Sequence, residues 1–531
     1  MNLNEWFLLF LSFNLIIFGG SYKLFKLAGV ESWKSLIPIY NIVKHLDIIN
    51  RPRWWAILVF IPVINLLMIP VIWIEFIKTF NHNSKLDRLL VIFTLGFYIY
   101  YISYLSSKTK YIGKISFSNF EKSIGSFIWA IVFATIVHNY ILQPFVIPTG
   151  SLEKTLRVGD FLLVSKFHYG ARIPSTVLSF PMVHDTIPVA GVKSYLFDDD
   201  FEKRNTSWRN KLQLPYFRIP GFQKIKNNDY VVFGQPADTL RNMDIFTPDR
   251  NYYKPIDKKT NLVKRCVAIA GDTLEIIEGY VYINGLKNTL PYRAKLQFSY
   301  EVTLKPGKSF ERSIIEQLKT RYDITDGIYQ SGNKIIIPAA SDEAVSIFKN
   351  HPSVAKIDRY IQTEGERDIL KFPQDPSINW NRDFFGPLYI PEKGKSIIIN
   401  LDNIAIYKRI ITEYEGNKLS IKGNQIFINE KLTKTYTFKQ NYYWMMGDNR
   451  HNSIDARRWG FVPFDHVVGK PVFIWMSWNS NGKGLNKIRW ERLFSTVHPD
   501  GERTSYLIHF LILIAVYYGF KKWRKRNNTS V

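Results

Sequence analysis

Apolar positions gather into long runs near the two ends of the chain, whereas the middle of the chain shows only short apolar stretches. Five runs qualify as candidate membrane spans: residues 5–21, 54–77, 89–105, 124–146 and 505–520. The second and fourth reach about 20 residues, the length that crosses a hydrocarbon core of about 30 Å. The other three are shorter and need flanking residues or a thinner bilayer. The pattern predicts membrane regions at both ends with a long polar segment between them.

Basic residues between these runs orient the predicted spans. Lys and Arg cluster after the first, third and fifth runs: Lys23, Lys26, Lys34, Lys44, Arg51 and Arg53, then Lys108, Lys110, Lys114 and Lys122, then Lys521, Lys522, Arg524, Lys525 and Arg526. With five spans all three clusters lie in the cytoplasm, as the positive-inside rule requires. Residues 147–504 then face away from the cytoplasm. Within the first basic loop, residues 32–50 are typical of an interfacial amphipathic segment, broken at Pro38.

The first apolar run does not have the pattern of a signal peptide. Glu5 stands where a signal peptide has basic residues, and no small-residue cleavage site follows cleanly. We therefore expect this run to be a membrane helix.

Short apolar runs bounded by turn residues make the polar segment β-rich. Strands are expected at residues 161–164, 230–233 and 397–400, and hairpins at 273–283 and 418–428. The stretch 294–373 differs, because it combines helical spacing at 309–321, a strand-like run at 334–337 and a capped helix at 341–350. We expect a mainly β extracytoplasmic domain with a small α/β insertion, plus transmembrane helices.

Composition narrows the function classes. The 531 residues include 70 Lys and Arg against 45 Asp and Glu, a net charge of +25 that the cytoplasmic loops partly explain. No zinc-finger spacing or RNA-binding aromatic signature accompanies this charge, so nucleic acid is not an expected partner. The single cysteine, Cys266, excludes an intrachain disulfide framework. No His, Cys or Asp cluster has metal-ligand spacing, so neither a metal nor a cofactor is expected.

A turn of small residues, Pro148-Thr149-Gly150-Ser151, follows directly after the fourth apolar run. It leaves the Ser151 hydroxyl exposed next to the membrane, where it can act as a nucleophile. Ser and Thr also serve routinely in turns and helix caps, so a purely structural role stays open.

Lys264 lies in the otherwise apolar run 263–270, next to Arg265. Burial lowers the pKa of a lysine, and Arg265 can add a repulsive positive field. A neutral amine is a competent general base, so a Ser–Lys pair can replace a Ser-His-Asp triad. The alternative is an edge-strand lysine whose ammonium reaches water.

Residues 445–463 pack Gly, Asp, Asn, Arg and Ser into a short irregular loop. Asp448 and Asp455, close to three arginines, can form bidentate pairs that hold the loop rigidly. As an isolated string the loop is equally compatible with a structural turn.

Together, in this order and after a membrane span, the three elements resemble bacterial type I signal peptidases, the Ser–Lys leader peptidases. That family shows a Pro-Ser-Gly-Ser-Met turn, a Lys-Arg strand and a Gly-Asp-Asn-Arg-Asp-Asn-Ser-x-Asp-Ser-Arg loop. This chain has Pro148-Thr149-Gly150-Ser151-Leu152, Lys264-Arg265 and a loop that begins Gly447-Asp448-Asn449-Arg450. The run 228–233 is similar to a fourth family element. The resemblance covers most of the exported domain except its insertion.

The resemblance implies a role for each matching residue. Ser151 is expected as the nucleophile and Lys264 as the general base. Thr149 would join the Ser151 backbone N–H in an oxyanion hole, and Ser453 would hydrogen-bond and orient the lysine. The remaining matches are two ion pairs that hold the loop, Asp448 with Arg265 and Asp455 with Arg457, and four residues that line substrate pockets, namely Phe145, Ile147, Leu156 and Val263.

Four positions depart from the family pattern. Thr149 keeps the hydroxyl but adds a methyl group, Leu152 replaces a methionine, and Lys154 replaces a proline. His451 stands where the family usually has Asp. This histidine invites a Ser–His mechanism, but a single loop histidine is more often structural. The N-terminal apolar runs also exceed the family's usual one or two spans, without an assigned role.

The resemblance implies a serine endopeptidase of the bacterial cytoplasmic membrane that cleaves signal peptides from exported precursors after small residues. The expected domains are residues 1–123, a membrane region; 124–146, an anchor; 147–504, the catalytic domain with its insertion at 294–373; and 505–531, a last span and basic tail. Partners would be the precursors, the lipid bilayer and the export machinery. The alternatives are a non-catalytic membrane scaffold that binds exported chains and a processing protease for other extracytoplasmic substrates.

Overall fold

The computed structural model describes residues 2–528, except 114–115, 238–251, 480–481, 483 and, between 312 and 326, all but 313, 315 and 317. The chain divides into two compact units. The first comprises Met1–Ile141, Ala171–Ile219 and Asp238–Lys259, and the second comprises Leu142–Gly170, Pro220–Ala237 and Thr260–Val531. Every catalytic or pocket residue predicted from the sequence lies in the second unit.

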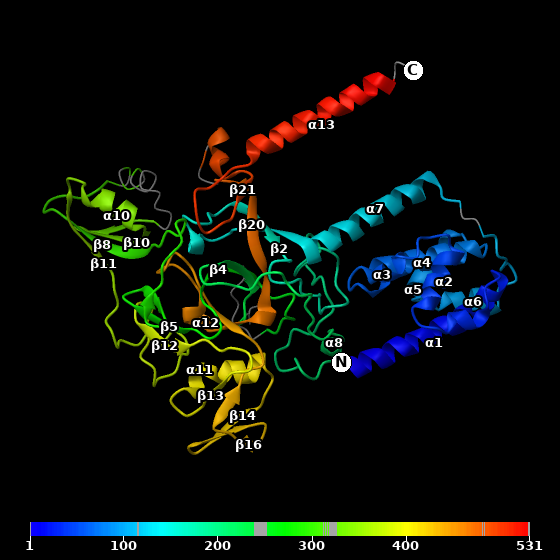
Figure 1. Ribbon diagram of the computed structural model, residues 1–531, viewed down its shortest axis with the longest axis horizontal. Helices are drawn as coiled ribbons and strands as arrows, with labels where there is room; N and C mark the ends of the chain where they lie inside the picture. Colours follow the sequence, from blue (N-terminus) through cyan, green and yellow to red (C-terminus); the bar gives the residue numbers. More distant parts are fainter. Residues whose placement is uncertain are drawn as a thin grey trace. The chain divides into compact units, whose positions relative to one another are not determined.

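The N-terminal part of the first unit is helical (Figure 1). Its helices are α1 (Leu3–Leu27), η1 (Ser32–Ser35), α2 (Tyr40–Ile48), α3 (Trp55–Phe60), α4 (Asn65–Thr79), α5 (Lys85–Phe93), α6 (Tyr98–Tyr104), α7 (Asn119–Ile136) and the π-helical η2 (Val137–Ile141). They share one apolar core, in which Phe25 of α1 and Phe76 of α4 are fully buried. Trp129 of α7 packs on Trp55 of α3 with ring centroids 5.1 Å apart. A short helix, α8 (Trp208–Lys211), lies in the part of this unit that follows β2 in sequence.

Among the described residues, two helices are long and apolar enough to cross a membrane: α1, and α7 together with η2. The predicted span 54–77 is instead two helices, α3 and α4. They separate at Pro62, and Val63 there has a φ of 71°. The predicted span 89–105 is likewise divided, because Leu95 and Gly96 have positive φ between α5 and α6.

The remaining expectations for apolar and amphipathic segments have mixed outcomes. The predicted span 124–146 is helical only as far as Ile141, because Leu142–Val146 forms the strand β1. The last run lies in α13 (Leu507–Asn528). The segment 32–50 forms η1 and α2 with the expected break at Pro38, after which Ile39 takes a φ of 67°.

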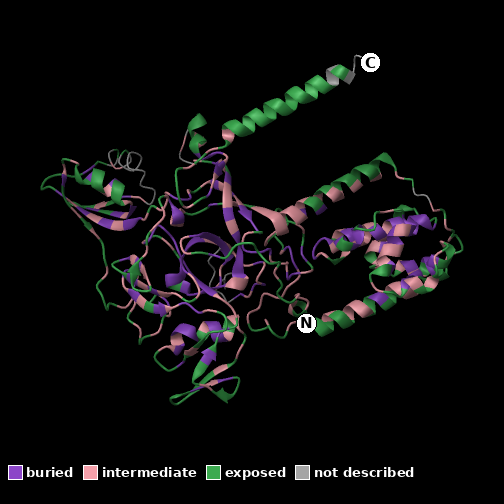
Figure 2. Ribbon diagram, in the orientation of Figure 1, coloured by how far each residue is buried: buried purple, intermediate pink, exposed green. Residues whose placement is uncertain are grey.

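An eight-stranded antiparallel sheet forms the centre of the second unit. Its strands are β1 (Leu142–Val146), β2 (Asp160–Ser165), β3 (Tyr230–Gly234), β4 (Asn261–Ala268), β18 (Tyr442–Met446), β19 (Val462–Pro463), β20 (Val467–Ser477) and β21 (Ser495–Thr496). The order is β1-β2-β20-β3-β4-β18-β19, with β21 paired to β20. All five residues of β3 and of β18 are buried. Figure 2 shows further buried positions along β20 of the same sheet. Lys264 of β4 therefore lies on an interior strand, between β3 and β18.

Smaller sheets complete this unit. One contains β12 (Phe385–Tyr389), β5 (Thr273–Ile277), β6 (Tyr280–Ile283) and β7 (Leu286–Lys287); others are β13 (Ser396–Ile398) with β17 (Thr435–Thr437), and β14 (Leu419–Lys422), β15 (Gln425–Ile428) and β16 (Lys431–Leu432). Both predicted hairpins are confirmed as β5–β6 and β14–β15. Glu278 and Gly279 have φ of 49° and 77°, the left-handed geometry that a two-residue hairpin turn requires.

The segment that begins near residue 296 forms a separate sheet with its own apolar core. The sheet has the order β11-β8-β10-β9, from β8 (Phe298–Leu304), β9 (Tyr329–Ser331), β10 (Lys334–Ala340) and β11 (Val354–Arg359). Helix α10 (Asp342–Lys349) is capped by Ser341, whose side chain accepts from the Ala344 N–H. The expected strand 334–337 and helix 341–350 thus correspond to β10 and α10. The expected helix 309–321 falls largely outside the described residues.

The other short elements link these sheets. They are η3 (Gly150–Leu152), α11 (Ile404–Arg409), the π-helical η4 (Ile410–Tyr414), α12 (Ala456–Trp459), η5 (Phe464–His466), η6 (Gly484–Lys487) and η7 (Trp490–Arg492). Of these, η3 carries Ser151 and α12 closes the loop that follows β18. Both therefore belong to the site described next.

Candidate active site

Ser151 lies in η3, in the connection between the antiparallel neighbours β1 and β2. The base of this connection is closed by two backbone hydrogen bonds, from the Ile147 N–H to the Asp160 carbonyl and from the Gly159 N–H to the Ile147 carbonyl. Leu152 is buried in the core beneath the turn and anchors it. The adjacent Ser151 is only half-buried. The two backbone hydrogen bonds and the buried Leu152 thus hold the turn in place. The Ser151 hydroxyl group stays accessible to neighbouring side chains.

The Nζ atom of Lys264 donates a hydrogen bond to the Ser151 Oγ atom over 2.5 Å. The Lys264 residue is only 4 % exposed, because β3 and β18 flank its strand. This burial lowers the pKa of Lys264 to about 8. A substantial fraction of the lysine is therefore neutral, and able to accept a proton, in mildly alkaline solution.

The cation that adds to this lowering is Arg457, and not Arg265 as the sequence suggested. Successive residues of a strand point to opposite faces, so Lys264 and Arg265 diverge. Arg265 also donates two hydrogen bonds to the Asp448 carboxylate, at 2.7 and 2.6 Å, so its charge is matched by that of Asp448. The carboxylates of Asp455 and Asp448 oppose the effect of burial on Lys264.

The loop after β18 holds the turn of Ser151 in place through its backbone. The Asn449 N–H donates to the Ser151 carbonyl at 3.1 Å, and the Asn449 side-chain amide donates to the Gly150 carbonyl at 3.3 Å. Gly447 passes so close that a Cβ atom there would lie 2.3 Å from the Ser453 Oγ and 2.5 Å from the Ser151 carbonyl oxygen. Only glycine fits at this position without displacing the turn.

Two buried ion pairs stabilise this loop. Arg265 and Asp448 are both fully buried, and Asp448 also accepts a hydrogen bond from the Thr155 hydroxyl at 2.8 Å. Burial alone would raise the pKa of Asp448, but Arg265 keeps it below its ordinary value. Asp455 pairs with Arg457 at 2.8 Å and accepts the Gly447 N–H at 3.1 Å. The loop is therefore connected to β4 and to the turn of Ser151, and is also held by contacts within itself.

Ser453 differs from its expected role. Its hydroxyl group is buried beside Gly447, and no described residue forms a hydrogen bond with it, so the expected bond to Lys264 is absent. The lysine ammonium instead points at Ser151. Thr149 has an extended backbone with φ of −130° and is exposed, two residues before the nucleophile.

The four residues expected to line substrate pockets belong to one apolar cluster. Ile147 and Leu156 are buried within it, at 3 % and 1 % exposed, whereas Phe145 and Val263 are partly exposed at its edge. In this structure the first two therefore form part of a filled core. Only Phe145 and Val263 present apolar surface that a substrate can contact.

His451 lies in the interior and does not contact Ser151. Its Nδ1 accepts the Ser299 N–H, and its Nε2 lies 2.9 Å from the Asp383 carboxylate. Burial lowers the pKa of His451, although Asp383 acts in the opposite direction. These contacts give the histidine a structural role, linking the loop to β8 and to the segment before β12.

Sequence reasoning assigned no role to Asn449, Thr155 or Asp383. Asn449 lies inside the quoted loop motif, but a motif does not reveal that its N–H meets the Ser151 carbonyl. The contacts of Thr155 and Asp383 join positions 293 and 68 residues apart, so no local pattern could have indicated them.

A second Ser–Lys hydrogen bond lies in the first unit. The buried Lys258 donates to the Ser179 Oγ at 2.6 Å and also to the Val183 carbonyl at 3.2 Å. Burial lowers the pKa of Lys258, while Asp257 and Asp185 act against this. This contact between Lys258 and Ser179 therefore serves as an internal comparison for the contact between Lys264 and Ser151. Within the described residues, no group of three or more His, Cys, Asp or Glu could hold a metal ion.

The family model described as "Signal peptidase, peptidase S26" matches residues 121–329 and 393–478, which together make up more than half of the chain. The chain belongs to this family. It is therefore a serine peptidase, a hydrolase, and its catalytic domain is mostly β. The unmatched stretch between the two parts contains β10, α10 and β11. A separate model, for a family of unknown function (DUF5684), matches residues 33–114, which include α2 to α6.

Curated relatives of this peptidase carry the name signal peptidase I. That of Buchnera aphidicola (subsp. Acyrthosiphon pisum) is 24 % identical over 370 residues, which cover 68 % of this chain and 77 % of the relative. That of Haemophilus influenzae is 23 % identical over 370 residues, covering 69 % and 72 %. That of Helicobacter pylori strain J99 is 21 % identical over 386 residues, covering 70 % and 91 %.

Proposed function

We propose that this peptidase cleaves signal peptides from exported precursor proteins by a Ser–Lys mechanism, with Ser151 as nucleophile and Lys264 as general base. The observation that carries the proposal is the 2.5 Å contact between Lys264 Nζ and Ser151 Oγ, with the lysine buried and its pKa about 8. The family and the name of its relatives support the substrate class.

The chemistry follows from this pair. The Ser151 Oγ attacks the scissile carbonyl carbon while neutral Lys264 takes the hydroxyl proton. Lys264 then donates that proton to the departing amine, so the peptide C–N bond breaks and an acyl-enzyme ester remains. Water attacks the ester, its proton passes to Lys264, and the Ser151 hydroxyl is restored. Thr149 and the Ser151 N–H are the proposed donors to the oxyanion.

Two features support a substrate bound as an added strand. β1 lies at one end of the order of the large sheet, with β2 as its only neighbouring strand among the described residues. It leads directly to Ser151, so a peptide paired with it would pass the nucleophile. Backbone hydrogen bonds would provide affinity, and small pockets near Phe145 and Val263 would favour small side chains. The buried Ile147 and Leu156 would form the floor beneath them.

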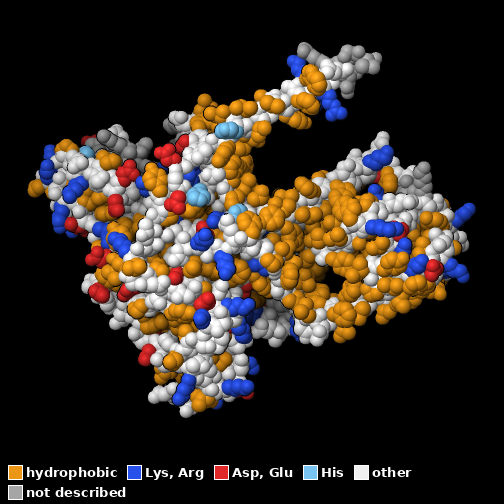
Figure 3. Space-filling model, in the orientation of Figure 1, with side chains coloured by type: hydrophobic (Ala, Val, Ile, Leu, Met, Phe, Trp, Pro, Cys, Tyr) orange, Lys and Arg blue, Asp and Glu red, His pale blue; other side chains and the backbone are white. Residues whose placement is uncertain are grey.

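We further propose three membrane crossings, by α1, by α7 with η2, and by α13. The first two are the apolar helices that are long enough. The apolar side chains of α13 are exposed along its length, and Lys521, Lys522 and Arg524 follow them (Figure 3). Without the two interrupted runs, an odd number of crossings still precedes each basic cluster in the loops and tail. All three basic clusters therefore remain cytoplasmic and the catalytic domain remains extracytoplasmic.

A reporter fused after Arg526 should therefore be cytoplasmic, and one inserted near Lys349 extracytoplasmic. Finding both reporters on the same side of the membrane would refute this topology.

The domain division follows from this topology. Residues 1–123 and 124–141 form the membrane region and anchor, 142–504 the catalytic domain, and 505–531 the last span and tail. The α/β segment is proposed as an insertion, and its residues 330–373 lie in the stretch of the chain that the family model leaves unmatched. The bilayer orients the substrate, because the apolar segment of a precursor lies in the same membrane. The export machinery is the expected source of these precursors.

The direct test is to incubate the detergent-solubilised protein with an exported precursor and to read the cleavage site by mass spectrometry. Cleavage after a small residue at the end of the signal peptide is expected. Cleavage only of mature or unrelated extracytoplasmic chains would favour a different processing protease. A Ser151→Ala variant that keeps the cellular function would favour a non-catalytic scaffold.

A further inference from the structure

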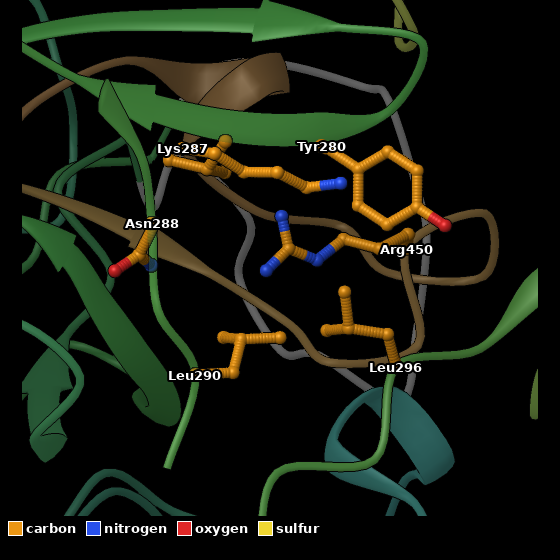
Figure 4. Close-up of a pocket in the computed structure, with 7 residues that line it drawn as sticks. Tyr280, Lys287, Asn288, Leu290, Leu296 and Arg450 are labelled. Atoms are coloured by element: carbon orange, nitrogen blue, oxygen red, sulfur yellow. The ribbon is translucent and has the colours of Figure 1, made fainter. Parts of the chain in front are cut away.

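A small cavity of about 120 Å³ lies beside the loop that follows β18, against the hairpin of β6 and β7. Arg450 enters it from the loop, and Tyr280, Lys287 and Asn288 line it from the hairpin side (Figure 4). Leu290 and Leu296 form apolar walls. None of these lining residues carries a carboxylate, and two of them are cations. The cavity therefore has the charge of an anion site.

Arg450 is buried and lacks an ionic partner among the described residues. It is 2 % exposed, its Nε has no hydrogen-bond partner among the described residues, and its Nη1 donates a weak hydrogen bond to the Met446 sulfur over 3.9 Å. The two nearby guanidinium groups differ, because Arg265 is paired with Asp448 and Arg457 with Asp455. Burial and the charge of Arg457 lower the pKa of Arg450 to about 10, although the carboxylates of Asp448 and Asp455 act in the opposite direction without forming an ion pair with it. The guanidinium still carries its charge at neutral pH.

An unpaired buried charge costs free energy that a counter-ion would recover. The backbone of Arg450 cannot move away easily, because its N–H donates to the Gln297 carbonyl and its carbonyl accepts from Arg457. Figure 4 shows the guanidinium directed into the cavity, on the side of Lys287 and Asn288. A planar guanidinium with free N–H groups matches a carboxylate or phosphate.

We propose that this cavity binds a small oxyanion, a phosphate or a short carboxylate, between the guanidinium of Arg450 and the ammonium of Lys287. The volume suits an ion of this size and excludes an extended ligand. Lys287 lies 3.9 Å from the centroid of the Tyr280 ring and is exposed, so it stands at the entrance. Leu290 and Leu296 limit water around the bound ion and strengthen its attraction to Arg450.

The probes are sodium phosphate and sodium acetate, titrated into the full-length protein in a maltoside detergent at constant ionic strength. Phosphate binding is followed by ³¹P line width, and binding of either ion by the unfolding temperature. One saturable site is expected, with a higher unfolding temperature as it fills. Saturation by phosphate, by acetate or by both identifies the oxyanion that the site takes.

The variants separate this site from binding elsewhere on a basic protein. Lys287→Gln should weaken binding at least tenfold, and Leu290→Trp, which fills the cavity, should abolish it. Lys308→Gln, an exposed lysine outside the cavity, is the matched control and should bind normally. Arg450→Gln should abolish the response and raise the unfolding temperature in anion-free buffer, because an unpaired charge is removed. The proposal is overturned if neither ion saturates, or if Lys287→Gln and Leu290→Trp bind as the parent protein does.

Discussion

Lys264 Nζ and Ser151 Oγ lie 2.5 Å apart although 113 residues separate them in the chain. The sheet order places β4 between β3 and β18, and the loop after β18 reaches the Ser151 carbonyl through Asn449. The contact thus depends on three segments that the fold brings together. Because the lysine is buried at this contact, the proposed mechanism predicts that its protonation affects both activity and stability.

The first prediction concerns pH and activity. Burial lowers the pKa of Lys264 to about 8, and only the neutral amine accepts the Ser151 proton. The rate of cleavage should therefore rise about tenfold per pH unit below about 7 and level off above about 8.5. The measurement is kcat/KM for a precursor peptide from pH 5 to pH 10. A rate that is flat between pH 5 and pH 8 would contradict a lysine base.

The second prediction concerns stability. A lysine whose pKa is lower in the folded than in the unfolded protein binds fewer protons when folded between about pH 8 and 10.5, so stability rises with pH across that window. Below it, the buried charge costs the folded state on the order of 3 kcal/mol. Lys264→Met should therefore raise the unfolding temperature at pH 6.5 while it abolishes cleavage. A lower unfolding temperature would show that the ammonium stabilises the fold.

The third prediction concerns Gly447. A Cβ atom at this position would overlap the Ser453 hydroxyl and the Ser151 carbonyl, so Gly447→Ala must displace the nucleophile turn. A displacement of about 1 Å typically costs about 100-fold in rate. We expect a loss of this size in kcat with the fold retained by circular dichroism. Gly125→Ala, at a helical glycine with open space around it, is the control and should keep full activity. Full activity of Gly447→Ala would disprove the tight contact.

The fourth prediction compares two ion pairs. Asp448→Asn leaves the fully buried Arg265 without its counter-charge and should destabilise the protein by about 3–5 kcal/mol. Asp358→Asn breaks the exposed pair with Lys356 and should cost less than about 1 kcal/mol. Denaturant unfolding of the solubilised protein measures both. Equal losses for the two variants would mean that the buried pair does not hold the loop.

Local patterns predicted the β-rich domain because turn chemistry is local. The Glu278-Gly279 turn has left-handed backbone, and the preceding strand β5 alternates between buried and less buried positions. The motif residues could be recognised because their types and order are specific. The residues that contact them could not be predicted from the sequence, because contacts such as that of His451 with Asp383 depend on how distant segments pack.

Hydropathy failed where backbone geometry interrupts an apolar run. It counted residues 54–77 as one span, although Pro62 divides it, and it extended the fourth span over β1. An apolar strand beneath a membrane and the end of an apolar helix have the same composition, so only pairing with β2 distinguishes them. The position of Ser453 was misjudged for another reason. A family motif predicts which residue occupies a position but not the orientation of its side chain. The orientation of the Ser453 hydroxyl depends on packing against Gly447.

The central claim is that Lys264, and not His451, is the base for Ser151. The most direct measurement is the cleavage rate of a precursor peptide by Lys264→Arg and His451→Ala, each checked for membrane insertion, beside Ser151→Ala and Ser179→Ala. A guanidinium cannot act as a base, so Lys264→Arg should lose several orders of magnitude, as should Ser151→Ala. His451→Ala should lose less than about tenfold, and Ser179→Ala, at the second Ser–Lys contact, nothing. An active Lys264→Arg beside an inactive His451→Ala would contradict the account and establish a Ser–His mechanism.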